Sequence, residues 1–263
     1  MKNSTLQAEP SKVRRAAEYG AAVLFWLALW HIASLRTGNG ILLVSPLEAA
    51  KRLLSLLATA DFWRTAAFSF LRITGGFFAA LASGILLAAA AAAVPFVRTL
   101  LSPVTAAVKA TPAASFIILA LIWIPSRNLA LLISFLLAFP VIYTNTLTGI
   151  LAVDGKLLEM ARVFGIPPVK RLLYVYLPDV MPFLASACSV SIGFCWKSGI
   201  AAEVIGQPDG SIGDKLYKAK IYLETADLFA WTAVIILMSA AFERLFLLLI
   251  KALERKLFKG GMV

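Results

Sequence analysis

Long apolar stretches recur along this chain, and several approach or exceed the ~20 residues that an α-helix needs to cross a bilayer. They bring the hydrophobic fraction to 60%, against about 45–50% in a soluble domain. Lipid offers no hydrogen-bond partner to an exposed backbone group, so a segment inside the bilayer must form a helix or join a closed barrel. The residue alternation of barrel strands is absent. The sequence therefore predicts an all-α integral membrane protein.

Six membrane-spanning helices are predicted from the positions of these stretches. The spans lie near residues 18–35, 68–94, 108–125, 128–151, 181–205 and 227–250. The segment 95–108 contains Pro95, Arg98 and Pro103, which favour a connector that dips into the membrane interface. An amphipathic helix is predicted from Pro46 to Leu57, between the first two spans, with a break at Asp61.

The distribution of Lys and Arg predicts the orientation, because basic residues favour cytoplasmic segments. They are more numerous on the side that holds the N-terminus. This predicts a single transmembrane domain at residues 18–250, flanked by cytoplasmic segments at 1–17 and 251–263, with a cytoplasmic loop at about 154–178. Both termini are then cytoplasmic. The net charge of +11 is accounted for by anionic lipid headgroups at these flanks, and no nucleic-acid partner is predicted.

The loop at 154–178 is charged and rich in proline, although apolar spans lie on both sides of it. Asp154 can cap a short helix, Gly165 can stop that helix in the left-handed conformation, and Pro168 suits the first turn of a second helix. The apolar face of the first helix is predicted to consist of Leu157, Ala161 and Phe164. These residues alone leave two alternatives open: a solvated loop that rests on the lipid headgroups, or a docking surface for a soluble partner.

The spacing within this loop carries a resemblance to a known family. The chain has Glu159-Met160-Ala161, then Gly165 after three residues, then Val175-Tyr176-Leu177-Pro178 after nine more. This run resembles the EAA loop of ABC importer permeases, in which Glu-Ala-Ala, Gly and Ile-x-Leu-Pro have the same spacing. Met160 in place of Ala and Val175 in place of Ile are mild departures.

The resemblance extends over about residues 60–255 and is closest to the nitrate, taurine and sulfonate group of these permeases. The residues that carry it outside the loop are Ser69, Arg72, Gly76 and Phe77, then Trp196, Ala202 and Glu203, and finally the turn Gly210-Ser211-Ile212-Gly213. It implies a MetI-like fold, with a six-helix transmembrane domain and a cytoplasmic coupling helix.

The same resemblance implies the partners and the roles of the loop residues. Glu159 is expected to face the polar surface of an ATPase, Ala161 to permit close approach, and Gly165 to set the turn. The other residues of this coupling motif are Met160, Leu177 and Pro178. The expected complex lies in the bacterial cytoplasmic (inner) membrane and contains two ABC ATPase subunits, a second permease copy forming a homodimer, and a periplasmic or lipid-anchored substrate-binding protein.

The fifth predicted span is the most polar and has the smallest side chains, so it is the predicted wall of the solute path. The predicted path residues are Ser189, Gly193, Trp196, Lys197 and Glu203. Ionisable side chains at membrane depth are costly and therefore candidates for function. The alternative is that Lys197 and Glu203 only hold neighbouring helices together.

These features predict a permease subunit that is not itself an enzyme. The chain has no Gly-x4-Gly-Lys-[Ser/Thr] phosphate loop, so ATP and Mg²⁺ are expected on a separate ATPase chain and no cofactor on this one. The transported solute is a small molecule, and the resemblance suggests an oxyanion such as nitrate, sulfonate or taurine. The alternative is a secondary transporter or channel that acts without an ATPase, which should show inverted repeats or ionisable residues along its spans.

Overall fold

The computed structural model describes residues 12–259, and all secondary structure in that range is helical. The prediction of an all-α fold is confirmed. Residues 1–11 and 260–263 of the predicted terminal segments lie outside the described range. In chain order the elements are α1 (Lys12–Thr37), α2 (Pro46–Leu57), α3 (Ala60–Ala93), α4 (Pro95–Ala110), α5 (Ala113–Ala120), α6 (Ser126–Leu151), α7 (Gly155–Val163), α8 (Pro168–Arg171), the π-helix η1 (Leu172–Tyr176), α9 (Leu177–Gly206), α10 (Ile212–Ile221) and α11 (Thr225–Lys259).

Five helices of the described chain are long and apolar enough to cross a membrane, and the bent pair α4–α5 makes a sixth if it counts as one span. Four predicted spans correspond to helices α1, α6, α9 and α11. The span predicted at 68–94 corresponds to α3, which already begins at Ala60 because Thr59 accepts a hydrogen bond from the Phe62 amide and caps it. The predicted break before this helix therefore lies at Ala58-Thr59, and not at Asp61.

The span predicted at 108–125 is wrong because the chain breaks inside it, and the segment predicted as a connector at 95–108 is helical. Val94 is extended, so Pro95 takes the first helical position, where its missing N–H is not needed. The helix α4 then continues through Pro103 to Ala110. The chain breaks at Thr111, which is extended because the α conformation is disfavoured before Pro112. Beyond this break α5 runs at 103° to α4.

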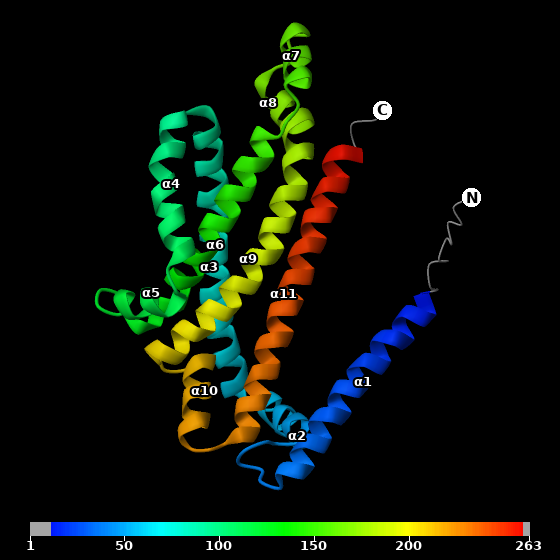
Figure 1. Cartoon of the computed structure of the whole chain (residues 1–263), viewed down its shortest axis with the longest axis vertical. Helices are drawn as coiled ribbons and strands as arrows, with labels where there is room; N and C mark the ends of the chain where they lie inside the picture. Colours follow the sequence, from blue (N-terminus) through cyan, green and yellow to red (C-terminus); the bar gives the residue numbers. More distant parts are fainter. Residues whose placement is uncertain (1–11, 260–263) are drawn as a thin grey trace, which may run out of the picture.

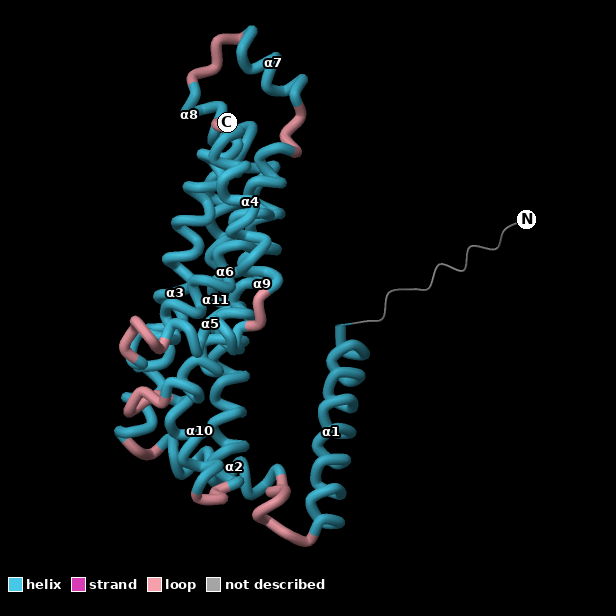
Figure 2. Tube along the Cα trace, turned by 60° about the vertical axis from the view of Figure 1, so that its left-hand side comes forward, coloured by secondary structure: helices cyan, strands magenta, loops and turns pink. Residues whose placement is uncertain are grey.

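The centre of the molecule is built by α3, α6 and α9, which lie side by side in Figures 1 and 2. Small residues on α3 face α6: a Cβ at Gly76 would lie 2.4 Å from the Leu131 carbonyl oxygen, and one at Gly84 would lie 2.9 Å from Ile142. The small-residue stripe of α3 thus allows two helices of the same chain to pack closely. Large side chains fill the remaining space and include Ile73, Phe77, Ile133, Ile192 and Trp196.

This close packing predicts that alanine substitutions at two glycines of α3 differ in their effect on stability. Gly84→Ala should destabilise the permease by about 1–3 kcal/mol, because the new methyl group overpacks the contact with Ile142. Gly75→Ala is the matched control, since its methyl group would meet Leu131 at an ordinary 3.6 Å. The measurement is thermal unfolding of both variants in detergent. Equal melting temperatures for the two variants would contradict the packing described for α3 and α6.

The two ends of the molecule differ. At one end α7, α8 and the C-terminal end of α11 lie together, and at the other end lie α2 and α10 (Figure 1). The α2–α10 end is held by ion pairs: Arg52 donates to Asp227, with Nη2–Oδ2 at 2.9 Å, and Lys215 lies 2.6 Å from Asp61. The hydrogen bond that Arg52 donates to the Asp227 carboxylate raises the pKa of Arg52.

Helix α1 stands apart from the bundle (Figure 2), and its apolar side chains are exposed over most of its length. It is attached near its C-terminal end, where Trp30 donates to the Val44 carbonyl at 3.0 Å and its ring lies 5.1 Å from that of Phe229.

The predicted amphipathic helix α2 begins with a reciprocal cap made by Ser45 and Glu48. The Glu48 amide donates to the Ser45 hydroxyl, and the Glu48 carboxylate accepts from the Ser45 amide. Ser45→Ala should cost about 0.5–2 kcal/mol, which is the usual value of an N-cap. Ser45→Asp, which restores a capping acceptor, should recover most of the loss in thermal unfolding. If Ser45→Ala melts at the same temperature as the wild type, α2 does not depend on its cap.

Candidate functional site

The loop that follows α6 begins with a capped helix, as predicted. The Asp154 carboxylate accepts a hydrogen bond from the Lys156 amide at 2.9 Å, and α7 runs from Gly155 to Val163. A carboxylate at this position also interacts favourably with the positive end of the helix dipole. Glu159 lies on this helix and is exposed.

The helix α7 ends at a left-handed glycine. Gly165 has φ +63°, the Ile166 amide donates to the Ala161 carbonyl at 2.9 Å, and the Gly165 amide donates to the Arg162 carbonyl at 3.0 Å. These two bonds form a Schellman motif, which ends a helix and fixes the exit direction of the chain. The expected turn at Gly165 is therefore present.

The second half of the loop is continuous with the next span. Pro168 occupies the first position of α8, and the chain stays helical through η1 and α9 to Gly206. Leu177 and Pro178 are half-buried at the start of α9. Pro178 lies in the first turn of α9, directly after η1. A displacement of α8 thus reaches the centre of the molecule along one helix.

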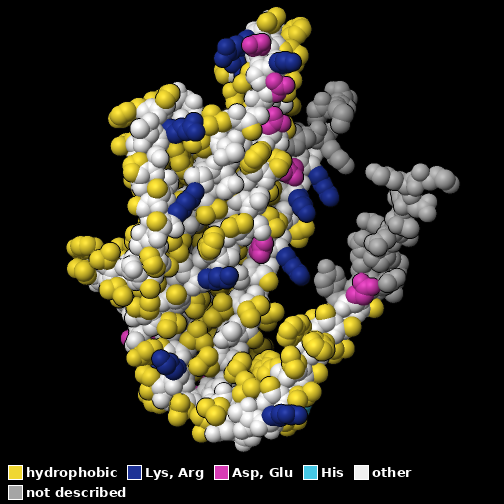
Figure 3. All heavy atoms as spheres, in the orientation of Figure 1, with side chains coloured by type: hydrophobic (Ala, Val, Ile, Leu, Met, Phe, Trp, Pro, Cys, Tyr) yellow, Lys and Arg dark blue, Asp and Glu magenta, His cyan; other side chains and the backbone are white. Residues whose placement is uncertain are grey.

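Apolar side chains on α7 are exposed in a stripe. Met160 is 48% exposed, Val163 84% and Phe164 75%, and positions three and four apart lie on one face of a helix. Leu157 extends the same stripe by one turn. We call these four residues the α7 stripe; Figure 3 shows the yellow side chains at this end of the molecule, among Lys, Arg, Asp and Glu side chains. Exposed apolar clusters of this kind mark interaction surfaces.

The predicted apolar face of α7 needs a correction at Ala161. Its side chain is fully buried within the chain, so it does not lie on the exposed stripe with Leu157 and Phe164. The methyl group of Ala161 instead packs inside the loop, where its carbonyl also closes the turn at Ile166.

Two of the predicted path residues are buried. Glu203 has no exposed surface, and its Oε2 atom accepts from the Ser69 hydroxyl at 2.7 Å and from the Gly213 amide at 3.1 Å. Ser69 also accepts from the Ile212 amide at 2.9 Å. Trp196 is 2% exposed, and the centroid of its ring lies 6.0 Å from that of Phe70. Both residues lie in the packed bundle, and Glu203 fits the alternative of a residue that joins helices.

The joint made by Glu203 links α3, α9 and α10. Gly213 approaches α9 so closely that a Cβ would lie 2.3 Å from the Glu203 Cβ. The chain reaches this position through Gln207 and Gly210, which both have positive φ. Sequence reasoning marked Ser69, Glu203 and Gly213 separately through the family resemblance. It did not predict that Ser69 and Gly213 both donate to Glu203, because Ser69 lies 134 residues before Glu203.

The other three predicted path residues differ in their surroundings. Ser189 is half-buried and donates to Glu243 of α11. Gly193 is half-buried, with no atom within 4 Å of a Cβ placed on it. Lys197 is exposed and lines a cavity of about 390 Å³ together with Lys109 of α4. Lys109 was not among the predicted path residues, because the sequence placed it at the start of a predicted span.

Comparison with known proteins agrees with this architecture. Residues 80–259 match the family described as "Binding-protein-dependent transport system inner membrane component". The taurine transport system permease protein TauC of Escherichia coli (strain K12) is 26% identical over 244 residues, which cover 90% of this chain and 87% of that protein. The putative aliphatic sulfonates transport permease protein SsuC of Bacillus subtilis (strain 168) is 26% identical over 236 residues, covering 89% and 83%.

The fold is also found in a solved structure. A crystal structure of an amino acid ABC transporter with histidines matches 73% of this chain and 90% of its own chain, with a TM-score of 0.50 and 20% identity. The likeness supports the MetI-like arrangement of the helices. Together with the family match, it confirms the resemblance that the EAA-type spacing indicated. The chain therefore belongs to the binding-protein-dependent transport system inner membrane components, the membrane-spanning permease subunits of ABC importers.

Proposed function

We propose that this permease is driven through its α7 loop, which docks onto a separate ATPase subunit on the cytoplasmic side of the membrane. The observation that carries the proposal is the α7 stripe, an exposed apolar surface on the helix that bears the EAA-type sequence. Glu159, also exposed on α7, offers a polar contact beside the stripe. Docking would remove this apolar surface from water, which stabilises the complex by about 25 cal/mol for each Å² buried.

The connections of the loop determine how a movement is transmitted. The helix α6 ends at Leu151, only a few residues before α7, and α8 continues without a break into α9. A rotation of the docked loop therefore moves two of the three central helices. Because packed helices interdigitate and resist continuous deformation, such a shift favours a change between discrete arrangements of the bundle.

The remaining parts of the importer follow from the same arrangement. The α2–α10 end lies opposite the docking loop and is the surface that receives a substrate-binding protein from outside (Figure 1). ATP and Mg²⁺ are bound by two ATPase chains, and this chain holds no cofactor. A second copy of the chain completes the path as a homodimer, with both termini in the cytoplasm. The relatives named for taurine and aliphatic sulfonates favour a small sulfonate or another oxyanion as the solute.

The test is reconstitution. The permease is co-expressed with the ATPase and binding protein of its own transport system, purified, and placed in liposomes. We expect the ATPase to co-purify with the permease. We also expect solute transport to depend on ATP supplied on the side of the membrane that carries the ATPase. Uptake by the permease alone under an ion gradient would contradict the proposal and favour a secondary transporter.

A further inference from the structure

A cationic cavity lies where α4, α6 and α9 meet. It has a volume of about 390 Å³ and is lined by Lys109 at the end of α4 and Lys197 on α9, with the hydroxyl groups of Thr111 and Ser198 beside them. The rest of the wall is apolar and includes Phe194. The cavity thus has two positive charges in the wall of a largely apolar space, while both hydroxyl groups already donate to backbone carbonyls four residues earlier in the chain.

A second cavity continues along the same groove between α4 and α6. It has a volume of about 220 Å³ and is lined by Arg98 together with the hydroxyl groups of Ser102 and Thr105. Arg98, Ser102, Thr105 and Lys109 are spaced by three or four residues, so they share one face of α4. The two cavities meet at Thr144 of α6, which lines the second one and accepts a hydrogen bond from Lys109 Nζ at 3.2 Å.

The charges of this groove are not neutralised by the described chain. Among the described residues that line the two cavities, none is acidic. Lys197 and Arg98 make no hydrogen bond or ion pair with another described residue, and Lys109 has only the Thr144 hydroxyl. Figure 3 shows Lys and Arg side chains spaced along this face, over α4 and then over α9. Uncompensated cations at membrane depth are costly and therefore mark candidate sites for an anion or a water-filled path.

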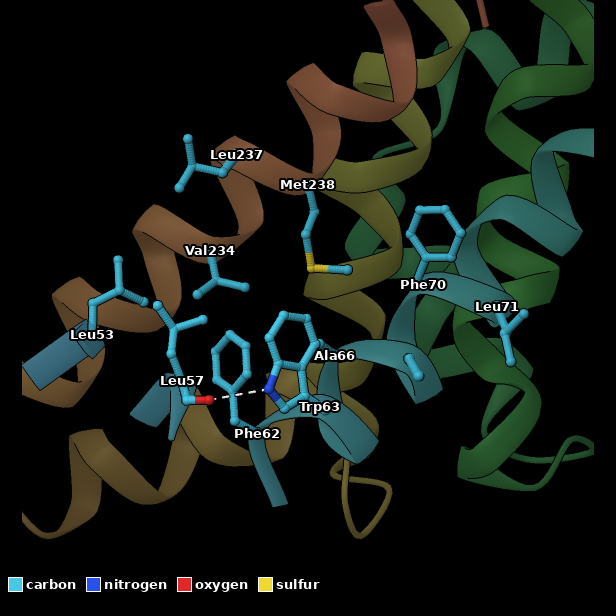
Figure 4. Close-up of a pocket in the computed structure, with 11 residues that line it drawn as sticks. Leu53, Leu57, Phe62, Trp63, Ala66, Phe70, Leu71, Val234, Leu237 and Met238 are labelled. Carbon is cyan, nitrogen blue, oxygen red and sulfur yellow. Dashed lines mark hydrogen bonds between the residues drawn. The ribbon is translucent and has the colours of Figure 1, made fainter. Parts of the chain in front are cut away.

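Another cavity of the described chain has a different character. It lies between α2, α3 and α11, has a volume of about 470 Å³, and is lined by apolar side chains such as Phe70, Val234 and Met238 (Figure 4). The Trp63 indole N–H drawn there already donates to the Leu57 carbonyl at 3.1 Å. This cavity has no group that could orient a charge.

We infer that the groove formed by Arg98, Lys109 and Lys197 is where this permease binds the anionic group of its solute. Lys197 and Lys109 bind its negatively charged group, the apolar wall around Phe194 accepts its carbon chain, and Arg98 takes over the charged group nearer the α3–α4 end. Successive cations let the anion move between sites that are each weak enough to leave. This inference rests on the proposed function and adds the residues of this chain that bind the solute.

The experiment measures anion binding directly. The full-length permease with its ATPase is placed in nanodiscs of neutral phosphatidylcholine, and trifluoromethanesulfonate is titrated as a ¹⁹F NMR probe with an apolar body. We expect saturable line broadening for the wild type. Lys109→Gln with Lys197→Gln should weaken binding at least about tenfold, the usual effect of losing a hydrogen bond to a charged group. Lys109→Arg with Lys197→Arg should retain binding.

The control variant is Lys251→Gln, which removes one exposed charge on α11 outside both cavities. It should bind the probe as the wild type does, and gel filtration checks that each variant is folded. Equal binding by the Gln double variant, or no saturable binding by the wild type, would overturn the inference. A third result would also overturn the inference: phosphatidylglycerol displaces the probe, and the Gln double variant keeps normal solute uptake. The site would then hold a lipid headgroup. Failure of the ATPase to co-purify with the wild type would refute the proposed function instead.

Discussion

Replacing Gly165 by valine is expected to reduce ATP-driven uptake to background and to release the ATPase. Gly165 has φ +63°, a conformation in which a β-branched residue is a steric outlier. The strain of about 1–2 kcal/mol is small compared with the stability of the bundle, so the variant should still insert into the membrane. The turn, however, should open and redirect the α7 stripe. Uptake in proteoliposomes and co-purification of the ATPase measure the effect.

The matched control for this variant lies in the same loop. Gly155 begins α7, has negative φ, and has no atom within 4 Å of an added Cβ. Gly155→Ala should therefore retain both uptake and the ATPase. If the Gly165 variant transports as well as the Gly155 variant, the turn has no part in coupling.

The second large effect is expected at Glu203. Glu203→Ala removes the acceptor that serves the Ser69 hydroxyl and the Gly213 amide, both of which are buried. Each buried donor left without a partner costs about 1–3 kcal/mol, and the removed side chain leaves a cavity besides. The expected result is a large fall in melting temperature in detergent, together with loss of uptake because α10 no longer holds the end of α9.

Glu203→Gln distinguishes this role from a function of the negative charge in the path. Glutamine retains a carbonyl oxygen that accepts from Ser69 and Gly213, so this variant should lose much less stability than Glu203→Ala and keep measurable uptake. A glutamine variant with wild-type stability but no uptake would show that the charge itself acts in transport.

Local patterns allowed much of the loop to be predicted from the sequence. The cap at Asp154 and the stop at Gly165 depend on residues close in the chain, and both are present. The family resemblance rested on the same local spacing. The side of α7 that is buried could not be predicted, because the burial of Ala161 depends on how the loop folds back on itself.

The errors at α4 and α5 also have a physical cause. Pro95 and Pro103 were both interpreted as helix breakers, but one occupies the first helical position and the other is tolerated inside α4. The break falls at Pro112, whose preceding residue is extended. With α4 misplaced, the common face of Arg98 and Lys109 could not be recognised, nor could the sequence bring Lys197 of α9 to the same cavity.

The central claim is that the α7 stripe lies on the cytoplasmic side and is covered by the ATPase. The most direct measurement is modification of Val163→Cys by a membrane-impermeant maleimide, because Val163 is exposed while Cys188 and Cys195 are buried. We predict rapid modification in inside-out vesicles without the ATPase, protection when the ATPase is present, and no reaction in right-side-out vesicles. Reaction in right-side-out vesicles, or equal reaction with and without the ATPase, would contradict the account.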